Sequence, residues 1–408
     1  MRRAVAAALL ASCTSPALAD PAPSYAQLLR QALANAPAIA EQAANVRAAQ
    51  AEARQSRAMP NPMVEAVAEN LAIPQTAGSG AERQTTFTIT QPLEIGGKRS
   101  ARIAAGEGNL TTAQARDRQA RIAFAADLAI AYATAEAMQD RQKLAADDLG
   151  RAREDLRAAR ALVTAGKEAD LRITQANASV AAAIAAEEAA AADTFEALER
   201  LSAMAGAATP YTCIDRSLLA VAAPKRVAVG PTLDDPPAVA TAVAERNALA
   251  AQVRIEQKRS IPDIGLSAGL RRFQGNGDSA LVVGVSATIP LFDRNRGNIA
   301  AARERANAAD ARLAAARLEA GAARRVAAAR VAAATGRLDA ANQGEAAAEE
   351  AYRLGRIGYD AGKIPLLELL TIRRALTEAR ALTIDARLGR VRALAALAQA
   401  DGQIAFGD

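Results

Sequence analysis

The hydrophobic spacing along the chain is of two kinds, and the changes between them occur twice in the same order. A helical pattern over residues 24–58 is followed by Pro60 and Pro62, which end a helix because proline lacks an amide donor and clashes with the preceding turn. Two short segments with a period of two come next, and a proline-free helical pattern then covers residues 97–163. The predicted unit is therefore a helix, two strands and a long helix.

The two short segments of the first copy are predicted to form a β-hairpin. Alternation places Val64, Ala66 and Ala68 opposite Glu65 and Glu69 in the first segment, and Thr86, Thr88 and Thr90 opposite Phe87 and Ile89 in the second. The loop between them, residues 73–83, is rich in glycine, proline and polar residues. Such a loop between two alternating segments is typical of antiparallel strands.

The second copy repeats this hairpin. Ile264, Leu266, Ala268 and Leu270 alternate with Asp263, Ser267 and Arg271, and Leu281, Val283, Val285, Ala287 and Ile289 share one face after a loop at 274–278. A sheet on a soluble core would alternate in the same way. These strands, however, are about as long as bilayer-spanning strands, and their non-apolar face is polar or charged. We predict a pore wall in which Glu65, Glu69 and Asp263 face the lumen and favour cations.

A very long helix follows each hairpin. Residues 97–163 would extend about 100 Å at 1.5 Å per residue, and a second pattern of this kind covers about 298–361. Leu149, Leu156 and Val163 recur every seven residues among many alanines, which favours close packing of the coiled-coil type. Each long helix meets an Ala-Gly-Lys turn and a returning helix, at 170–205 and 366–400.

Matched landmarks indicate that the chain is internally duplicated. Pro60 and Pro262 are 202 residues apart, Pro92 and Pro290 are 198 apart, and the lysines of the two Ala-Gly-Lys turns are 196 apart. We therefore predict a first repeat at 20–206, a proline-rich linking segment at 207–236 and a second repeat at 237–408.

Residues 1–19 have the features of a secretory signal peptide. Two arginines precede an alanine-rich stretch, and Ala17 and Ala19 form a cleavage site before Asp20. The alternative is a lipoprotein signal in which Cys13 becomes the acylated first residue, and the sequence leaves both open. Either signal exports the chain, and no later run of 18 uncharged apolar residues predicts a membrane-spanning helix.

Composition narrows the chemistry. Of the 408 residues, 51% are hydrophobic and only 3% aromatic, and much of the apolar content is alanine, a strong helix former. Histidine, the commonest general base and transition-metal ligand, does not occur, and Cys213 is the one cysteine after the signal region. We expect no enzyme, no cofactor and no metal site. The 50 basic and 44 acidic residues are interleaved, so no nucleic-acid partner is expected.

Four strands per chain leave two open sheet edges, and unpaired backbone groups cannot face lipid. Closure must come from further copies. Two copies would give eight strands around a bore filled by side chains, whereas three would give twelve strands around a lumen. A conduit therefore predicts a homotrimer surrounded by outer-membrane lipid.

Three strings carry a family resemblance: QPLEIGGKR at 91–99, VTAGKEADL at 163–171 and GYDAGKIPLLELL at 358–370. They resemble the TolC-like outer membrane factors, and among these the cobalt-zinc-cadmium resistance branch. The similarity spans nearly the whole chain after the signal. It implies a mainly α-helical fold with a small membrane β-barrel part. Three chains would form a twelve-stranded barrel in the outer membrane of a Gram-negative cell, continued into the periplasm by a long α-helical coiled-coil tunnel.

The resemblance also implies a function and partners. The chain is expected to be the passive exit duct of a tripartite efflux pump for divalent heavy-metal cations. Its partners would be a periplasmic adaptor (membrane fusion) protein and a proton-driven inner-membrane transporter of the resistance-nodulation-division type. The alternatives are a multidrug efflux or type I secretion duct and, in a different class, a periplasmic coiled-coil adaptor without a pore.

Two sets of residues would carry the site. Glycine permits a tight reversal at the periplasmic tips, where family members meet the adaptor, and the docking candidates are Gly166, Lys167, Tyr359, Gly362 and Lys363. Members similar to this chain narrow the closed tunnel just beyond the second turn with acidic rings. Glu368 matches one such position, and Thr371 replaces a second acidic residue. Three copies of Glu368 would form a cation-favouring constriction. Alternatively, these residues only shape the turns, and Glu368 is a solvated carboxylate.

Overall fold

The computed structural model describes residues 21–71, 83–166, 168–220, 235–275 and 277–407. The predictions that concern the signal region, Cys13 and Lys167 therefore fall outside the described residues.

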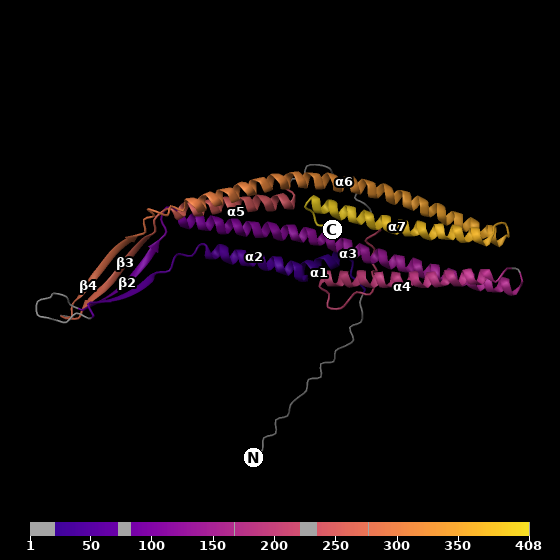
Figure 1. The fold of residues 1–408 in the computed structure, drawn as a ribbon, viewed down its shortest axis with the longest axis horizontal. Coiled ribbons are helices and arrows are strands. Elements are labelled where there is room, and N and C mark those ends of the chain that lie inside the picture. Colours follow the sequence, from indigo (N-terminus) through magenta and orange to yellow (C-terminus); the bar gives the residue numbers. More distant parts are fainter. Residues whose placement is uncertain (1–20, 72–82, 167, 221–234, 276, 408) are drawn as a thin grey trace, which may run out of the picture. The chain divides into compact units, whose positions relative to one another are not determined.

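The helices and strands follow the predicted order. They are α1 (Tyr25–Asn35), α2 (Pro37–Gln55), β1 (Met63–Glu69), β2 (Gln84–Leu93), α3 (Lys98–Thr164), α4 (Leu171–Ala205), α5 (Pro237–Arg259), β3 (Ile264–Phe273), β4 (Ser279–Ala287), α6 (Arg296–Asp360) and α7 (Leu366–Ala400). The long helices are confirmed, with 67 residues in α3 and 65 in α6. Figure 1 shows α4 returning along α3 and α7 returning along α6.

The first predicted helix is in fact two helices. Between α1 and α2, Ala36 has an extended backbone with a ψ of 133°. Pro37 follows it, and proline disfavours the helical conformation in the residue before it. The prediction of one continuous helix over residues 24–58 was therefore wrong.

The chain folds as two compact units. Unit 1 is drawn from Met1–Ala40, Ala120–Asp234 and Ala322–Asp408, and unit 2 from Glu41–Gln119 and Asp235–Gly321. Each unit uses residues of both sequence repeats, and α3 and α6 contribute to both units. The repeat boundaries at 206 and 237 concern the duplication and stay a prediction.

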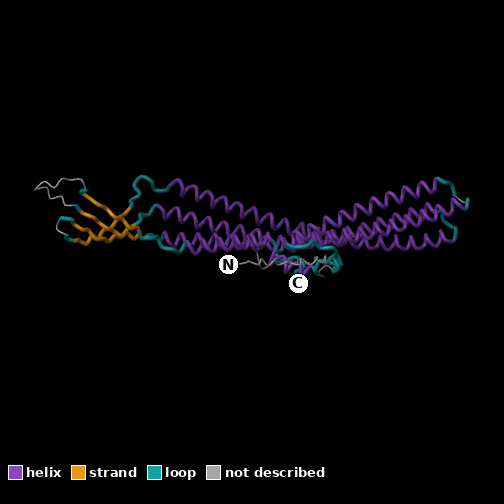
Figure 2. Tube along the Cα trace, turned by 90° about the horizontal axis from the view of Figure 1, so that it is seen from below, coloured by secondary structure: helices purple, strands orange, loops and turns teal. Residues whose placement is uncertain are grey.

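Unit 2 contains a four-stranded antiparallel sheet in the order β1-β2-β3-β4, drawn in orange in Figure 2. The register places Ile89 between Val64 and Ala268, and Ala268 opposite Val283. Directly opposed side chains lie on the same face of a sheet, so the apolar residues of all four strands share one face. The outer edges of β1 and β4 have no strand partner among the described residues.

The apolar face of this sheet is the exposed one. Phe87 is 58% exposed and Val283 72%, whereas Thr86 on the opposite face is only 7% exposed. A sheet that packs on a soluble core buries its apolar face instead. The exposure pattern therefore excludes that alternative and agrees with strands whose apolar side chains point outward.

Small residues and ion pairs hold the helices of unit 2 together. A Cβ added to Gly108 of α3 would lie 3.0 Å from the Cα of Ala248 in α5, which shows how closely these helices approach. The ion pairs that join successive segments are Arg57–Glu107 at 2.7 Å, Arg116–Glu245 at 2.6 Å and Arg246–Asp310 at 2.9 Å. The neighbours are therefore α2, α3, α5 and α6, in that order.

The helices of unit 1 are neighbours in the order α4, α3, α7, α6. The contacts that establish this order are Leu149 with Ala183, the ion pair of Arg141 with Asp385 at 2.5 Å, and the approach of Gly355 to Ile372, whose Cδ1 would lie 2.9 Å from an added Cβ. The short helix α1 also belongs to this unit and contacts α4.

A conventional apolar core lies in unit 1. Leu128 and Tyr132 are fully buried, and Tyr25 packs edge-on against Tyr132 with ring centroids 5.9 Å apart. The Tyr25 hydroxyl donates hydrogen bonds to the carbonyl oxygens of Ala125 at 2.8 Å and Ala405 at 2.9 Å. Burial raises the pKa of Tyr25, and it raises the pKa of Tyr132 to about 12. This core ties α1 and the C-terminal residues to α3.

Candidate functional site

The polar face of the sheet carries the predicted lumen carboxylates of β1. Glu65 and Glu69 are exposed and point to the same side, four positions apart with Val67 midway between them. The Nε2 amide of Gln84 donates a hydrogen bond of 2.9 Å to Glu69. The structure therefore places both carboxylates together on the non-apolar face, as the alternation predicts.

A basic residue shares this face. The register aligns Val67, Thr86 and Arg271 in one row, between the rows of Glu65 and Glu69. The Arg271 Nε donates a hydrogen bond of 3.1 Å to the Thr86 hydroxyl. The polar face therefore carries charges of both signs, and the sequence-based expectation of a cation-favouring face considered only the carboxylates.

The third predicted carboxylate, that of Asp263, forms an ion pair with a lysine. Asp263 lies just before β3, and its carboxylate is 2.7 Å from the ammonium of Lys98, the first residue of α3. An ion pair of this kind reduces the charge that Asp263 offers to a passing ion. Asp263 therefore has a different electrostatic role from the two carboxylates of β1.

Both Ala-Gly-Lys turns reverse the chain at a left-handed glycine. Gly166 has a φ of +68° and Gly362 a φ of +70°, and a Cβ added to either would meet nothing within 4 Å. The Lys363 amide donates to the Gly358 carbonyl at 2.8 Å, which closes the end of α6. These turns are therefore open surfaces, with Lys363 exposed beside Gly362.

Tyr359 differs from the other docking candidates. It is half-buried and lines a cavity of about 140 Å³ together with Tyr352, Arg151 and Arg373. Its position is in the wall between α3, α6 and α7 and not on the exposed turn. The sequence grouped Tyr359 with the turns because it precedes Gly362 by less than one helical turn.

Glu368 is exposed in the first turn of α7, where the helix dipole favours a carboxylate. It has no ion pair among the residues that the structure describes. Thr371, one turn later, donates its hydroxyl to the Leu367 carbonyl at 2.9 Å. Glu368 thus keeps an exposed charge without an ion pair in the described part of the chain, and the Thr371 hydroxyl is bonded within its own helix.

Sequence reasoning missed Arg373. This side chain is buried in α7 and forms ion pairs with Asp155 and, at 3.8 Å, with Asp148 of α3. It also lines a cavity of about 320 Å³ with Arg172 and Leu367. The sequence does not single it out, because α7 contains six arginines and the two partners of Arg373 are more than 200 positions away.

A second missed residue is Glu136, which anchors the linking segment to α3. Its buried carboxylate accepts hydrogen bonds from the Ser217 hydroxyl and from the amides of Leu218 at 2.8 Å and Leu219 at 3.1 Å. A buried carboxylate needs such donors to offset its desolvation. The described residues 207–220 of the linking segment are therefore a bound part of unit 1.

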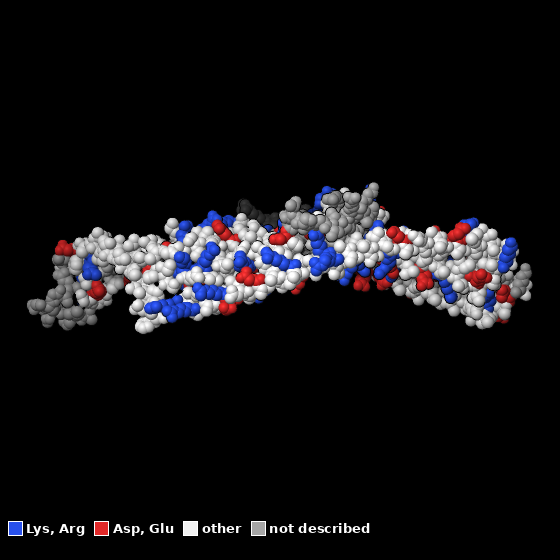
Figure 3. Space-filling model, turned by 90° about the horizontal axis from the view of Figure 1, so that it is seen from above, with Lys and Arg blue, Asp and Glu red and all other residues white. Residues whose placement is uncertain are grey.

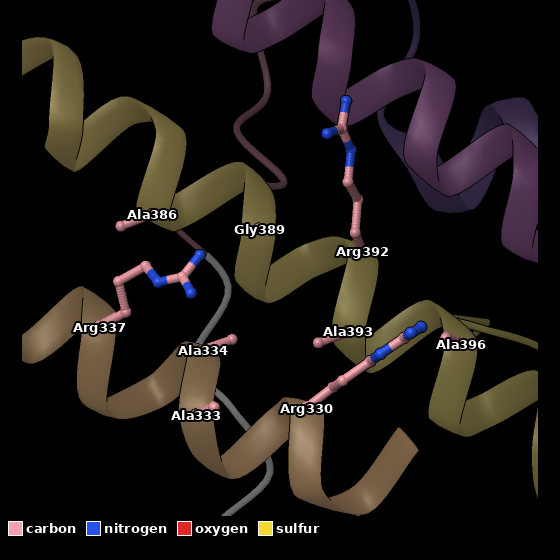
Figure 4. Close-up of a pocket in the computed structure, with 9 residues that line it drawn as sticks. All are labelled: Arg330, Ala333, Ala334, Arg337, Ala386, Gly389, Arg392, Ala393 and Ala396. Atoms are coloured by element: carbon pink, nitrogen blue, oxygen red, sulfur yellow. The ribbon is translucent and has the colours of Figure 1, made fainter. Parts of the chain in front are cut away.

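Arginines line a groove between α6 and α7. Figure 4 shows Arg330 and Arg337 on α6 beside the small residues Ala334 and Gly389, with a cavity of about 240 Å³. Arg392 of α7 turns toward α3, where it lies 3.5 Å from the Thr134 hydroxyl. Elsewhere basic and acidic side chains are interspersed, as Figure 3 shows for one face.

The described ranges contain no group of three or more His, Cys, Asp or Glu side chains that could hold a metal ion. Within the same ranges, no helix combines the length and the apolar composition needed to cross a membrane.

Comparison with known proteins points to one family. The family profile described as outer membrane efflux protein matches residues 28–207 and 230–403. The nickel-cobalt-cadmium resistance protein NccC of Alcaligenes xylosoxydans xylosoxydans is 58% identical over 98% of this chain and 92% of its own length. The nickel and cobalt resistance protein CnrC of Cupriavidus metallidurans is 57% identical over 94% of this chain and 92% of its own length.

Two further similarities are more distant. The cobalt-zinc-cadmium resistance protein CzcC of Cupriavidus metallidurans is 30% identical over 82% of both chains. Among solved structures, the outer-membrane channel OprN superposes with a TM-score of 0.78 over 93% of this chain and 90% of its own, at 22% identity. The latter similarity supports the fold.

Proposed function

This chain belongs to the outer membrane efflux protein family, and from that premise we propose that it is the duct through which a pump discharges divalent nickel, cobalt and cadmium cations. The observation that carries the substrate assignment is the 58% identity, over nearly the whole chain, to a nickel-cobalt-cadmium resistance protein. Zinc occurs in the name of the relative at 30% identity only. We therefore rank nickel and cobalt ahead of zinc.

The proposed duct is a homotrimer. A four-stranded sheet with an exposed apolar face and two open edges is unstable in lipid, since its edge amides and carbonyls lack partners. Three copies would pair the outer edge of β4 with that of β1 in the next copy and close a twelve-stranded barrel. The polar face with Glu65, Glu69 and Arg271 would then line the lumen.

The proposed partners are a periplasmic adaptor and an inner-membrane transporter of the resistance-nodulation-division type. The turns at Gly166, Gly362 and Lys363 support adaptor docking because they are exposed and contact no other part of the described chain that would occupy them. Lys167 lies outside the described residues. Tyr359 would contribute from the wall beside the turn.

The proposed constriction is a ring of three Glu368 carboxylates. Its support is that Glu368 is exposed at the start of α7, next to the second turn, and has no ion pair among the described residues. Thr371 would add a neutral hydroxyl one turn away. Three carboxylates held close together repel one another. Cations between them would reduce this repulsion, so the ring would favour cations over anions.

Metal tolerance of a strain that lacks this chain tests the function. Loss of the chain is expected to lower the tolerated concentrations of nickel and cobalt and to raise the nickel retained by the cells, and a plasmid copy is expected to restore both. A drug panel run in parallel is the matched control, because a general exit duct would change drug tolerance too. Sensitivity to drugs alone would reject the metal assignment and keep the duct.

Fractionation tests the pore. We expect a trimer in the outer-membrane fraction that dissociates on heating. Recovery of the chain as a periplasmic protein released by salt would reject the duct and favour the adaptor alternative.

A further inference from the structure

The groove between α6 and α7 has a floor of small residues. Gly389 lies in this floor, and a Cβ added to it would meet nothing within 4 Å. The cavity over the floor has a volume of about 240 Å³. Its small lining residues are Ala333 and Ala334 of α6 and Ala386, Gly389, Ala393 and Ala396 of α7. The two helices therefore leave room for a small molecule.

Arginine side chains border this cavity. Arg330 and Arg337, two helical turns apart on α6, extend across the groove toward α7, and Arg392 lies on the α7 side (Figure 4). None of the three has an ion pair among the described residues. A guanidinium group is a planar donor whose geometry matches the oxygens of carboxylates and phosphates. The groove therefore offers donors for an anion.

The positive charge of the groove is not compensated by described residues that line it, since none of these is acidic. Asp401 forms an ion pair with Arg324 at 2.7 Å, and Asp385 forms one with Arg141. Asp339 of α6 is exposed and does not line the groove. Like charges that share one groove repel one another, and an anion with two or more charges would relieve this repulsion.

A neighbouring cavity extends the positive charge. Arg392 also lines this second cavity, which has a volume of about 470 Å³ and lies among α3, α4 and α7. The other charged residues in its lining are Asp127 and Arg200, so one carboxylate faces two guanidinium groups. The excess of arginine therefore continues from α6 across α7 toward α4.

The groove lies on the side of α7 that faces away from the apolar core of unit 1. The residues of α7 in that core include Ile384, Leu388, Val391 and Ala395. At 3.6 residues per turn, these residues and those of the groove floor lie on nearly opposite sides of α7. The core also contains residues of α1 and of the C-terminal segment, and three copies of it inside a tube would block the bore. In the proposed duct the core must therefore lie outside, and the groove faces the lumen.

We propose that the groove lined by Arg330, Arg337 and Arg392 binds a small polyvalent oxyanion of the carboxylate or phosphate class. The position of this anion site along the lumen rests on the proposed duct, whereas binding itself requires only unit 1. Within the duct, a bound anion offsets the positive charge that a passing divalent cation would otherwise meet. The site thus lets an arginine-lined stretch of the tunnel conduct cations.

Isothermal titration calorimetry of the purified full-length protein in detergent tests the site. The probes are citrate and inorganic phosphate, each compared with sodium chloride at equal ionic strength. We expect one saturable site per chain for at least one of the two anions. Arg330→Gln combined with Arg337→Gln is expected to weaken this binding by about tenfold or more, because two charged donors are lost. Gly389→Leu is expected to weaken it as well, because the leucine fills the cavity while every arginine stays.

Arg325→Gln is the matched control. Arg325 is an exposed arginine of α6 that does not line the groove and has no ion pair in the described part of the chain, so its loss should leave the affinity unchanged. Binding of citrate alone or of phosphate alone supports the proposal and names the class of anion. Wild-type protein that binds neither anion saturably overturns the proposal, whether or not the variants fold. An equal loss of affinity in the control overturns it too.

Channel recordings separate the anion site from the duct. In reconstituted wild-type protein, the bound anion is expected to shift the reversal potential toward cations, and the double glutamine variant should show such a shift without the anion. Open channels that respond to neither change overturn the position along the lumen. Saturable anion binding in a protein that forms no channel and restores no nickel tolerance would instead reject the proposed function and leave the site in place, so the two failures are distinguishable.

Discussion

The sheet of unit 2 and the core of unit 1 bury opposite kinds of side chains. In the sheet, Val283 is exposed and Thr86 is buried, whereas in unit 1 Leu128 and Tyr132 are fully buried. The same apolar residue types thus point outward in one unit and inward in the other. Lipid offers no hydrophobic penalty to an exposed valine, and water does. The difference shows that the sheet of unit 2 and the core of unit 1 suit different solvents, and substitutions should act differently in each.

The largest effect is expected where the sheet has no room for a side chain. A Cβ added to Gly269 would lie 2.3 Å from the Phe87 carbonyl oxygen in the neighbouring strand. Gly269→Ala must therefore separate β2 from β3, at a cost of about 4 kcal/mol or more. Heat-resistant trimers in the outer membrane would be lost. Gly284→Ala is the control, because there the nearest atom is the rotatable Ser267 hydroxyl; equal losses in both variants would contradict this reason.

The next effect sharpens the contrast between the units. Leu128→Ala removes a fully buried side chain in unit 1 and is expected to cost about 3 kcal/mol. Val283→Ala removes an outward-facing side chain and is expected to cost less than about 1 kcal/mol in detergent or lipid. Denaturant unfolding of both variants in the same detergent measures the difference. Similar losses would mean that the apolar face of the sheet is packed against protein.

High pH is expected to destabilise unit 1 through its buried tyrosines. The pKa of Tyr132 is raised from 10.0 to about 12, mainly by burial and then by the charges of Glu136 and Asp215. The neutral phenol is favoured in the folded state, so its contribution is complete below pH 10 and is lost as the pH rises from 10 to about 12. Tyr132→Phe should weaken this decline in melting temperature. It should also cost about 1 kcal/mol at neutral pH, because the bond of the hydroxyl to the Arg216 carbonyl at 2.7 Å is lost. Identical slopes for both proteins above pH 10 would reject this source.

The smallest effect on stability is expected at Arg271. Among the described residues, the one hydrogen bond of its side chain is to Thr86, so Arg271→Gln should change the free energy of unfolding by less than about 1 kcal/mol. The variant should nevertheless shift the reversal potential of single channels toward cations, since a positive charge leaves the polar face. Glu69→Gln should shift it in the opposite direction. Unchanged potentials in both variants would show that this face does not contact the permeating ions.

The periodic parts of the fold could be predicted from the sequence. The alternation of apolar and polar residues predicted the four strands, and the long proline-free stretches predicted α3 and α6. Both signals are local and repeat many times. The break at Ala36 was not predicted, although Pro37 marks it in the sequence. The helical spacing of apolar residues continues on both sides of this proline. A single backbone restriction outweighed that period.

The candidate site was predictable only in part. Glu65, Glu69 and the turn glycines lie where their patterns placed them, because strand alternation and turn chemistry are local. The pairing of Asp263 with Lys98, and of Arg373 with Asp155, depends on segments distant in sequence. Glu136 was equally hidden, because two of its three donors are backbone amides, which no residue type reveals. The role of Glu368 in a constriction stays a prediction.

The middle of the sheet has a consequence for how the molecule is made. The central pair joins β2 to β3, for example Phe87 to Leu270, and α3, α4 and α5 lie between them in the sequence. A chain that emerges from its N-terminus presents the β1-β2 hairpin long before β3 exists, and an isolated hairpin is marginally stable. Pairing across such separations is slow. Closure of the four-stranded sheet should therefore be a late step in folding, and neither duplicated half should complete the sheet alone.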